Sequence, residues 1–99
     1  MRLSPEQVAV IRQGVARLAG DTARVWLFGS RVRGDERGGD VDLLLELDEA
    51  VEEPARLAAQ LAVHVSRSMH GRKVDVLIKA PNLLQLPIHA IALAEGVRL

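Results

Sequence analysis

Three aspartates have the residue type and spacing of ligands for a divalent cation. Asp40 and Asp42 stand two residues apart at the start of a leucine-rich segment, and Asp75 stands inside a later apolar segment. Side chains along a β-strand alternate between its two faces, so Asp40 and Asp42 would share a face, with Cβ atoms roughly 6–7 Å apart. Carboxylates so close repel each other unless a cation lies between them. Mg²⁺ prefers hard oxygen ligands and usually takes one or two carboxylates with phosphates and waters, so the pair predicts a magnesium site.

Asp75 is expected to join this acidic pair. Its neighbours Val74 and Val76 should face the core, which turns Asp75 to the opposite face of its strand. If that strand lies beside the strand of Asp40 and Asp42, all three carboxylates share one surface. The alternative is an ordinary role, because an isolated aspartate near a strand start is most often a solvated strand end or a turn cap. This alternative is weaker for Asp40 and Asp42 together, since an apolar strand is a poor place for charge without a role.

The loop before the aspartate pair has the composition of a phosphate-binding turn. Gly29 and Ser30 follow an apolar strand, and Arg31 and Arg33 come next. Glycine lets the backbone approach an anion closely, backbone N–H groups and the serine hydroxyl donate hydrogen bonds, and arginines add charge-assisted contacts to phosphate. A Gly-Ser pair alone is a weak signal, because turns use these residues widely. The loop has no lysine of the kind that a Walker A motif requires, so a P-loop is excluded.

Helices and strands alternate around these residues. Ser4 is a good N-cap for the first helix, Gln7 sits at the capping-box position, and apolar residues then recur at helical spacing. Short β-prone apolar runs predict the strands. Helices are predicted over 5–19, from Pro54 to the closing Gly71 and from Pro87 to Gly96, and strands over 24–28, 40–47 and 73–78.

This order predicts one domain over residues 1–99 of the α/β class, more narrowly α+β, in which a small mixed β-sheet is flanked by helices. The roughly eleven residues between the first two strands permit either a hairpin-like or a crossover connection, so the strand order stays open. Trp26 is expected in the core. The histidines lie far apart without the spacing of metal ligands, and His64 is expected to have an ordinary packing or surface role.

The composition excludes several classes of function. The chain has 99 residues, of which 13 are basic and 13 acidic. Nucleic-acid-binding domains usually carry a basic excess, so we expect no direct nucleic-acid binding. The absence of cysteine excludes a disulfide framework, a thiol nucleophile and a zinc–thiolate site. No apolar run reaches the ~18–20 residues of a membrane span, and the N-terminus lacks an apolar signal core, so a cytoplasmic protein without membrane attachment is expected.

Taken together, these segments resemble a known enzyme superfamily. An apolar strand, a Gly-Ser turn, an arginine-bearing loop, an Asp-x-Asp pair and a later strand with one aspartate are typical of the DNA polymerase β-like nucleotidyltransferases. Within them the chain resembles the minimal nucleotidyltransferases of the MntA-like antitoxin type. The resemblance covers about 25–78 and extends more weakly to the last helix. Nine residues separate Ser30 from Asp40 where the family most commonly has ten, a shortening that Gly38 and Gly39 could absorb.

The resemblance implies a role for each motif residue. Gly29 and Ser30 correspond to the turn that holds the triphosphate. Asp40 and Asp42 correspond to the two metal-binding aspartates, and Asp75 to the third carboxylate, which completes one metal site and helps to deprotonate the acceptor hydroxyl. Two Mg²⁺ ions would then support in-line attack of a hydroxyl on the α-phosphorus of ATP or another nucleoside triphosphate, with pyrophosphate leaving.

The resemblance also implies a protein partner. Such proteins form complexes with a small helical protein of the HEPN type, and as antitoxins they can transfer AMP from ATP to a tyrosine of that toxin, an RNase. We therefore expect a protein adenylyltransferase. The alternative is an antitoxin that neutralises its partner by contact alone; transfer to a small molecule is less expected, because the chain shows no acceptor domain. A homo-oligomer is compatible with either activity. Leu83, Leu86 and Ile91 could form a protein interface or belong to the core, and we expect the core.

Overall fold

The structure is a computed structural model of the chain that describes residues 3–29 and 40–99. The elements in chain order are α1 (Pro5–Ala19), β1 (Arg24–Phe28), β2 (Val41–Glu46), α3 (Pro54–Ser68), β3 (Val74–Lys79), α4 (Pro87–Glu95) and β4 (Val97–Arg98). Each predicted helix and strand is present, and β4 is a short strand that the sequence did not predict. Among the described residues, no helix combines the length and the apolar character needed to cross a membrane.

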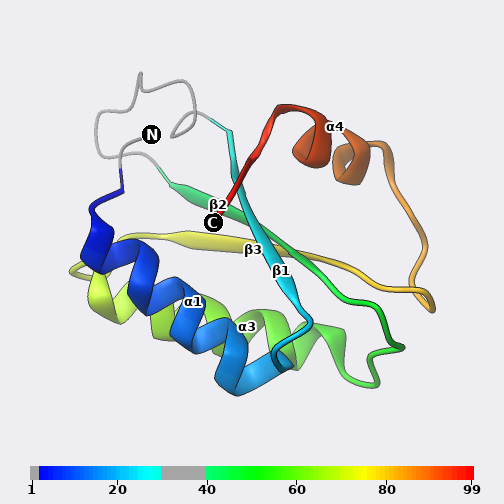
Figure 1. The fold of residues 1–99 in the computed structure, drawn as a ribbon, viewed down its shortest axis with the longest axis horizontal. Helices are drawn as coiled ribbons and strands as arrows, with labels where there is room; N and C mark the ends of the chain where they lie inside the picture. Colours follow the sequence, from blue (N-terminus) through cyan, green and yellow to red (C-terminus); the bar gives the residue numbers. More distant parts are fainter. Residues whose placement is uncertain (1–2, 30–39) are drawn as a thin grey trace.

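The strands form one mixed sheet in the order β3-β2-β1-β4, as the fold class predicted (Figure 1). β1 runs antiparallel to both β2 and β4, while β2 and β3 are parallel. The two possibilities left open for the first connection are thereby decided, because adjacent antiparallel strands make it hairpin-like. The parallel pair is joined through α3, as a crossover connection requires. The central strand β2 therefore lies between an antiparallel and a parallel neighbour.

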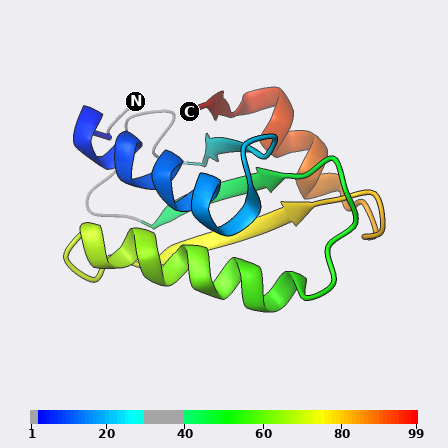
Figure 2. The same ribbon diagram turned by 60° about the horizontal axis from the view of Figure 1, so that its bottom comes forward.

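Helices cover the two faces of the sheet unequally. Val41, Leu43 and Leu45 of β2 are fully buried in the main core with side chains of α1 and α3. The alternate positions of β2 face the other side, where α4 packs against β1 and β2. Leu44 is fully buried on that side. Figure 2 shows α3 and α4 on opposite sides of the sheet. One face is therefore covered by two long helices and the other only in part, by the short α4.

Close contact between α1 and α3 depends on a glycine and a histidine. A Cβ atom at Gly14 would lie only 2.5 Å from Cδ2 of His64. His64 Nδ1 accepts a hydrogen bond from Arg17 at 3.2 Å, and Nε2 donates one to the Val10 carbonyl at 3.3 Å, an assignment that follows from the partners. The imidazole thus ties α3 to α1, and the packing role expected for His64 is confirmed.

Candidate active site

The β2–β3 pairing brings two of the predicted site residues together. Asp42 and Asp75 are direct partners in the parallel register, so both side chains project from the same sheet face. Asp40 precedes Asp42 by two residues, next to the start of β2. This face is the one opposite α1 and α3, because Val41 and Val74, the neighbours of the two paired aspartates, are buried in the main core. The condition set for Asp75, that its strand lie beside that of Asp40 and Asp42, is therefore met.

Gly29 stands directly against Asp42 of this carboxylate pair. Phe28, at the end of β1, is the register partner of Asp42, and Gly29 follows with φ of 84°. In this left-handed region a side chain is strained, which favours glycine. A Cβ atom at Gly29 would also lie 2.5 Å from Oδ2 of Asp42. Both backbone conformation and space therefore require glycine at the turn predicted to hold a triphosphate.

The surroundings of Asp42 disfavour its charged form. Partial burial raises the pKa of Asp42 most, and the nearby carboxylates of Asp75 and Asp40 raise it further, whereas Lys73 acts in the opposite direction. Loss of hydration and like charge both penalise a carboxylate. A divalent cation bound to these oxygens would relieve both penalties. The donor set is made of hard oxygen ligands, so it fits Mg²⁺.

Lys73 places one positive charge beside the carboxylates. Its Nζ lies 3.8 Å from Oδ2 of Asp40 and 4.0 Å from Oδ2 of Asp75. All three side chains are well exposed, so these long ion pairs are weak. The ammonium group nevertheless lies within reach of two oxygens that a metal ion would use. Sequence reasoning did not single out this lysine.

The aspartates do not form a closed three-ligand site in this structure. Within residues 3–29 and 40–99, no group of three histidine, aspartate or glutamate side chains is close enough to hold one ion jointly. Mg²⁺ usually binds a protein through one or two carboxylates and completes its shell with substrate phosphates and waters. Asp42 and Asp75 can supply that number. The predicted phosphate contacts Ser30, Arg31 and Arg33 lie outside the described residues.

Comparison with known protein families assigns the chain to one of them. The family described as "Nucleotidyltransferase domain" matches the chain over residues 8–95. The chain belongs to this family. All the predicted site residues, from Gly29 to Asp75, fall within the matched segment. None of the curated proteins matches the chain significantly.

The fold of this nucleotidyltransferase domain is also similar to a solved structure, described as "Crystal structure of the toxin-antitoxin with AMP-PNP". The TM-score is 0.71 at 14% sequence identity, and the alignment covers 97% of this chain and 72% of the other. At this identity the similarity concerns the arrangement of helices and sheet.

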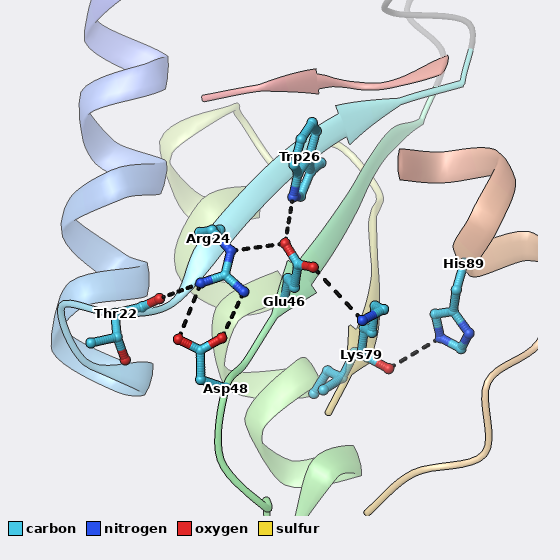
Figure 3. Close-up of polar contacts among 8 residues, drawn as sticks. Thr22, Arg24, Trp26, Glu46, Asp48, Lys79 and His89 are labelled. Atoms are coloured by element: carbon cyan, nitrogen blue, oxygen red, sulfur yellow. Dashed lines mark hydrogen bonds and ion pairs between the residues drawn. The ribbon is translucent and has the colours of Figure 1, made fainter. Parts of the chain in front are cut away.

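A second polar cluster lies at the other end of the same sheet face (Figure 3). Glu46 Oε1 accepts hydrogen bonds from Arg24 Nε at 2.9 Å and from Trp26 Nε1 at 3.2 Å. Lys79 Nζ lies 3.7 Å from the other carboxylate oxygen, Oε2. Arg24 also donates to Asp48 at 2.8 Å. The Arg24 hydrogen bonds are the main cause that lowers the pKa of Glu46 and of Asp48. These charges neutralise one another, so the cluster stabilises the sheet, about 13 Å along β2 from the aspartates.

His89 fastens α4 to the sheet, a role that sequence reasoning missed. Its Nδ1 accepts the backbone N–H of Leu86 at 2.9 Å, so Nε2 carries the proton and donates to the Ile78 carbonyl at 3.1 Å. The ring is buried and bonded at both nitrogens. The only sequence signal is a histidine at the third position of a proline-initiated helix, which is a rare capping residue. His89 therefore holds α4 against the end of β3.

Some apolar residues expected in the core lie elsewhere. Trp26 is half-buried on the face of the aspartates, because its strand neighbours occupy the core face. Leu86 and Ile91 are exposed, and the expectation of a core position was wrong for both. Leu83 packs partly buried against the main core, as expected. The difference arises because α4 turns its His89 side to the sheet and leaves the opposite side uncovered.

Proposed function

We propose that this domain is an Mg²⁺-dependent nucleotidyltransferase that transfers AMP from ATP to a hydroxyl of a partner protein, and that it acts as an antitoxin toward a HEPN-type toxin. The observation that carries the proposal is the pairing of Asp42 with Asp75 on adjacent strands, beside a glycine turn whose backbone only glycine adopts without strain. Membership of the nucleotidyltransferase family supports the reaction class.

The carboxylates have distinct roles in this proposal. Asp40, just before β2, and Asp42, on β2, would hold divalent metal. Asp75 from β3 would take the proton of the acceptor hydroxyl and share a metal. When bound, the metal ions supply charge neutralisation of the triphosphate and activation of the attacking oxygen. The hydroxyl oxygen forms a bond to the α-phosphorus, the bond to pyrophosphate breaks, and pyrophosphate leaves. The chain contributes mainly positioning and charge.

The nucleotide would enter from the side of Gly29. The glycine turn follows β1 directly and lies against Asp42, so its backbone stands next to an expected metal ligand, where a metal-bound phosphate would lie. Ser30, Arg31 and Arg33 would add donors to the phosphates. The net charge of zero and the three neighbouring carboxylates give this surface little attraction for nucleic acid. A nucleoside triphosphate that binds together with Mg²⁺ is the proposed ligand, because the metal offsets its repulsion from the carboxylates.

The fold similarity to a toxin-antitoxin structure with AMP-PNP supports both parts of the proposal. AMP-PNP is an analogue of ATP, and the assembly is one in which a protein partner is present. The alternative, neutralisation by contact alone, predicts the same partner without chemistry. The intact set of carboxylates favours an enzyme, because a contact function alone gives no reason to keep mutually repelling aspartates together.

The experiment uses the purified protein, a HEPN-type protein from the same genome, Mg²⁺ and ATP labelled in the α-phosphate. Label should appear on the HEPN-type protein, and ATP labelled in the γ-phosphate should leave it unlabelled. Asp42→Asn should abolish labelling while the variant stays folded and still binds the partner. Wild-type protein that forms the complex but transfers no label would refute the enzymatic function and support the contact mechanism.

A further inference from the structure

The exposed apolar residues of the described chain are concentrated around α4. Of the large apolar side chains that are exposed in residues 3–29 and 40–99, all but one fall within 84–97, and the exception is Val63 on α3. Leu84 is 80% exposed and Ile91 48%. Residues 80–94 contain no aspartate, glutamate, lysine or arginine. An uncharged, largely apolar surface of this kind is characteristic of a protein-binding site.

α4 is held against the sheet in a way that leaves this surface outward. At its start, His89 donates to the Ile78 carbonyl at the end of β3. At its end, Gly96 lies so close to β1 that a Cβ atom there would be 3.0 Å from the Leu27 carbonyl. Ala92, between these two anchor points, is fully buried. The sheet-facing side of α4 is thus occupied, and its opposite side has no partner among the described elements.

This apolar surface lies on the same side of the sheet as the aspartates, and α4 ends near them. α4 lies on the sheet face that carries Asp42, opposite α1 and α3. It begins near the polar cluster drawn in Figure 3 and ends beside Leu27, two residues before Gly29. A protein that lies along α4 therefore reaches the edge where Asp42 and Gly29 meet.

A rival surface exists on the helical side. An open groove of about 670 Å³ lies between α1 and α3, with Val63 and Leu18 in its lining. The sheet and the main core separate this groove from the aspartates. The groove lies on the opposite side of the sheet from Asp75, whereas α4 lies on the same side, so the α4 surface is the better placed of the two for an acceptor.

We propose that the outer side of α4, with Ile88 and Ile91, together with the segment before it, with Leu84 and Leu86, is the docking surface for the acceptor protein. This inference rests on the proposed function, because α4 is singled out by its position beside the proposed transfer site. The partner presents an uncharged apolar face, since a charged face would lose hydration against residues 80–94 without gaining an ion pair with them.

The test compares Ile91→Glu with Val63→Glu, a matched control on the rival surface, since Val63 is 50% exposed and Ile91 48%. Partner affinity is measured with the purified HEPN-type protein, and label transfer is measured at a subsaturating partner concentration. Ile91→Glu should weaken binding at least tenfold and reduce transfer by the same factor, with magnesium–ATP affinity unchanged. Val63→Glu should match the wild type. Leu84→Glu, at a still more exposed position, serves as an independent second variant.

The outcomes separate this inference from the proposed function. Unchanged binding in Ile91→Glu and Leu84→Glu, or weakened binding in Val63→Glu alone, would overturn the docking surface even if transfer occurs. Loss of the complex in Ile91→Glu and Leu84→Glu, with no transfer by the wild type, would support the docking surface and refute the catalytic role. A wild-type homodimer that Ile91→Glu dissociates, without effect on the HEPN-type complex, would assign α4 to a second copy of this chain and contradict the proposal.

Discussion

Neutralising Asp42 should stabilise the metal-free protein. Asp42 and Asp75 are direct partners on the adjacent strands β2 and β3, and like charges in such a pair cost roughly 0.2–1 kcal/mol of stability. Asn keeps the shape of the side chain and removes the charge. For a domain of this size the gain corresponds to a rise in Tm of about 1–8 °C. The rise in Tm is measured by thermal unfolding of wild type and Asp42→Asn in EDTA at pH 7, monitored by circular dichroism.

The pH dependence of this gain follows from the direction of the pKa shift. Burial and the neighbouring carboxylates raise the pKa of Asp42 in the folded protein above its unfolded value. The folded state therefore binds this proton more tightly, and wild-type stability falls as pH rises through the interval between the two values. The advantage of Asp42→Asn should be complete above the raised pKa and should vanish below the ordinary aspartate pKa of about 3.9.

Asp48→Asn is the control with the opposite sign. Asp48 accepts a hydrogen bond from Arg24, which lowers the pKa of Asp48, so its charge stabilises the folded state at neutral pH. Its neutralisation should lower Tm at pH 7, and this effect should disappear in acid. An Asp42→Asn variant that melts below the wild type in EDTA, or whose gain persists at pH 3, would refute the reasoning about the carboxylate pair.

Three further substitutions test other parts of the structure. Gly14→Ala should lower the free energy of unfolding in urea by up to about 2 kcal/mol, because a clash of about 1–3 kcal/mol with the His64 ring, which two hydrogen bonds hold in place, opposes a helix-propensity gain of about 1 kcal/mol. In a His64→Ala background the same change should stabilise the protein, and stabilisation in both backgrounds would contradict the packing. Gly29→Ala should lower stability by about 1–2 kcal/mol and abolish transfer, because φ is positive and the new Cβ meets Asp42; wild-type transfer by that variant would refute the turn's role. Lys73→Met should strengthen Mg²⁺ binding about 1.5- to fivefold, measured by the Mg²⁺-dependent shift in Tm, because an ammonium group that competes for the same oxygens is removed; unchanged or weaker binding would contradict that competition.

The sequence predicted those features that depend on local chemistry. Ser4 and Gln7 form both hydrogen bonds of the expected capping box, at 3.1 and 2.9 Å, and α1 occupies the predicted range. Alternation along two strands was enough to assign Asp42 and Asp75 to non-core faces, and their adjacency then depended only on strand order. That order is a property of the whole sheet, so the sequence left it open.

Other features depend on contacts that no local pattern encodes. β4 has two residues and exists because α4 returns the chain to the edge of β1. Ile91 was expected in the core because it is apolar. The short α4 packs only one side, that of His89 and Ala92, against the sheet, and Ile91 lies on the other side. His89 replaces the usual capping residues at the start of α4, and Lys73 approaches the aspartates only after β2 and β3 align.

The most direct test of the account is the position of the metal in crystals grown with Mn²⁺ and a non-reactive ATP analogue, determined from anomalous scattering. Mn²⁺ favours the same oxygen ligands as Mg²⁺. The account predicts an anomalous peak bonded to carboxylate oxygens of Asp42 and at least one of Asp40 and Asp75, with the triphosphate against Gly29. Bound nucleotide with no metal at these aspartates, or with metal at a different site, would contradict it.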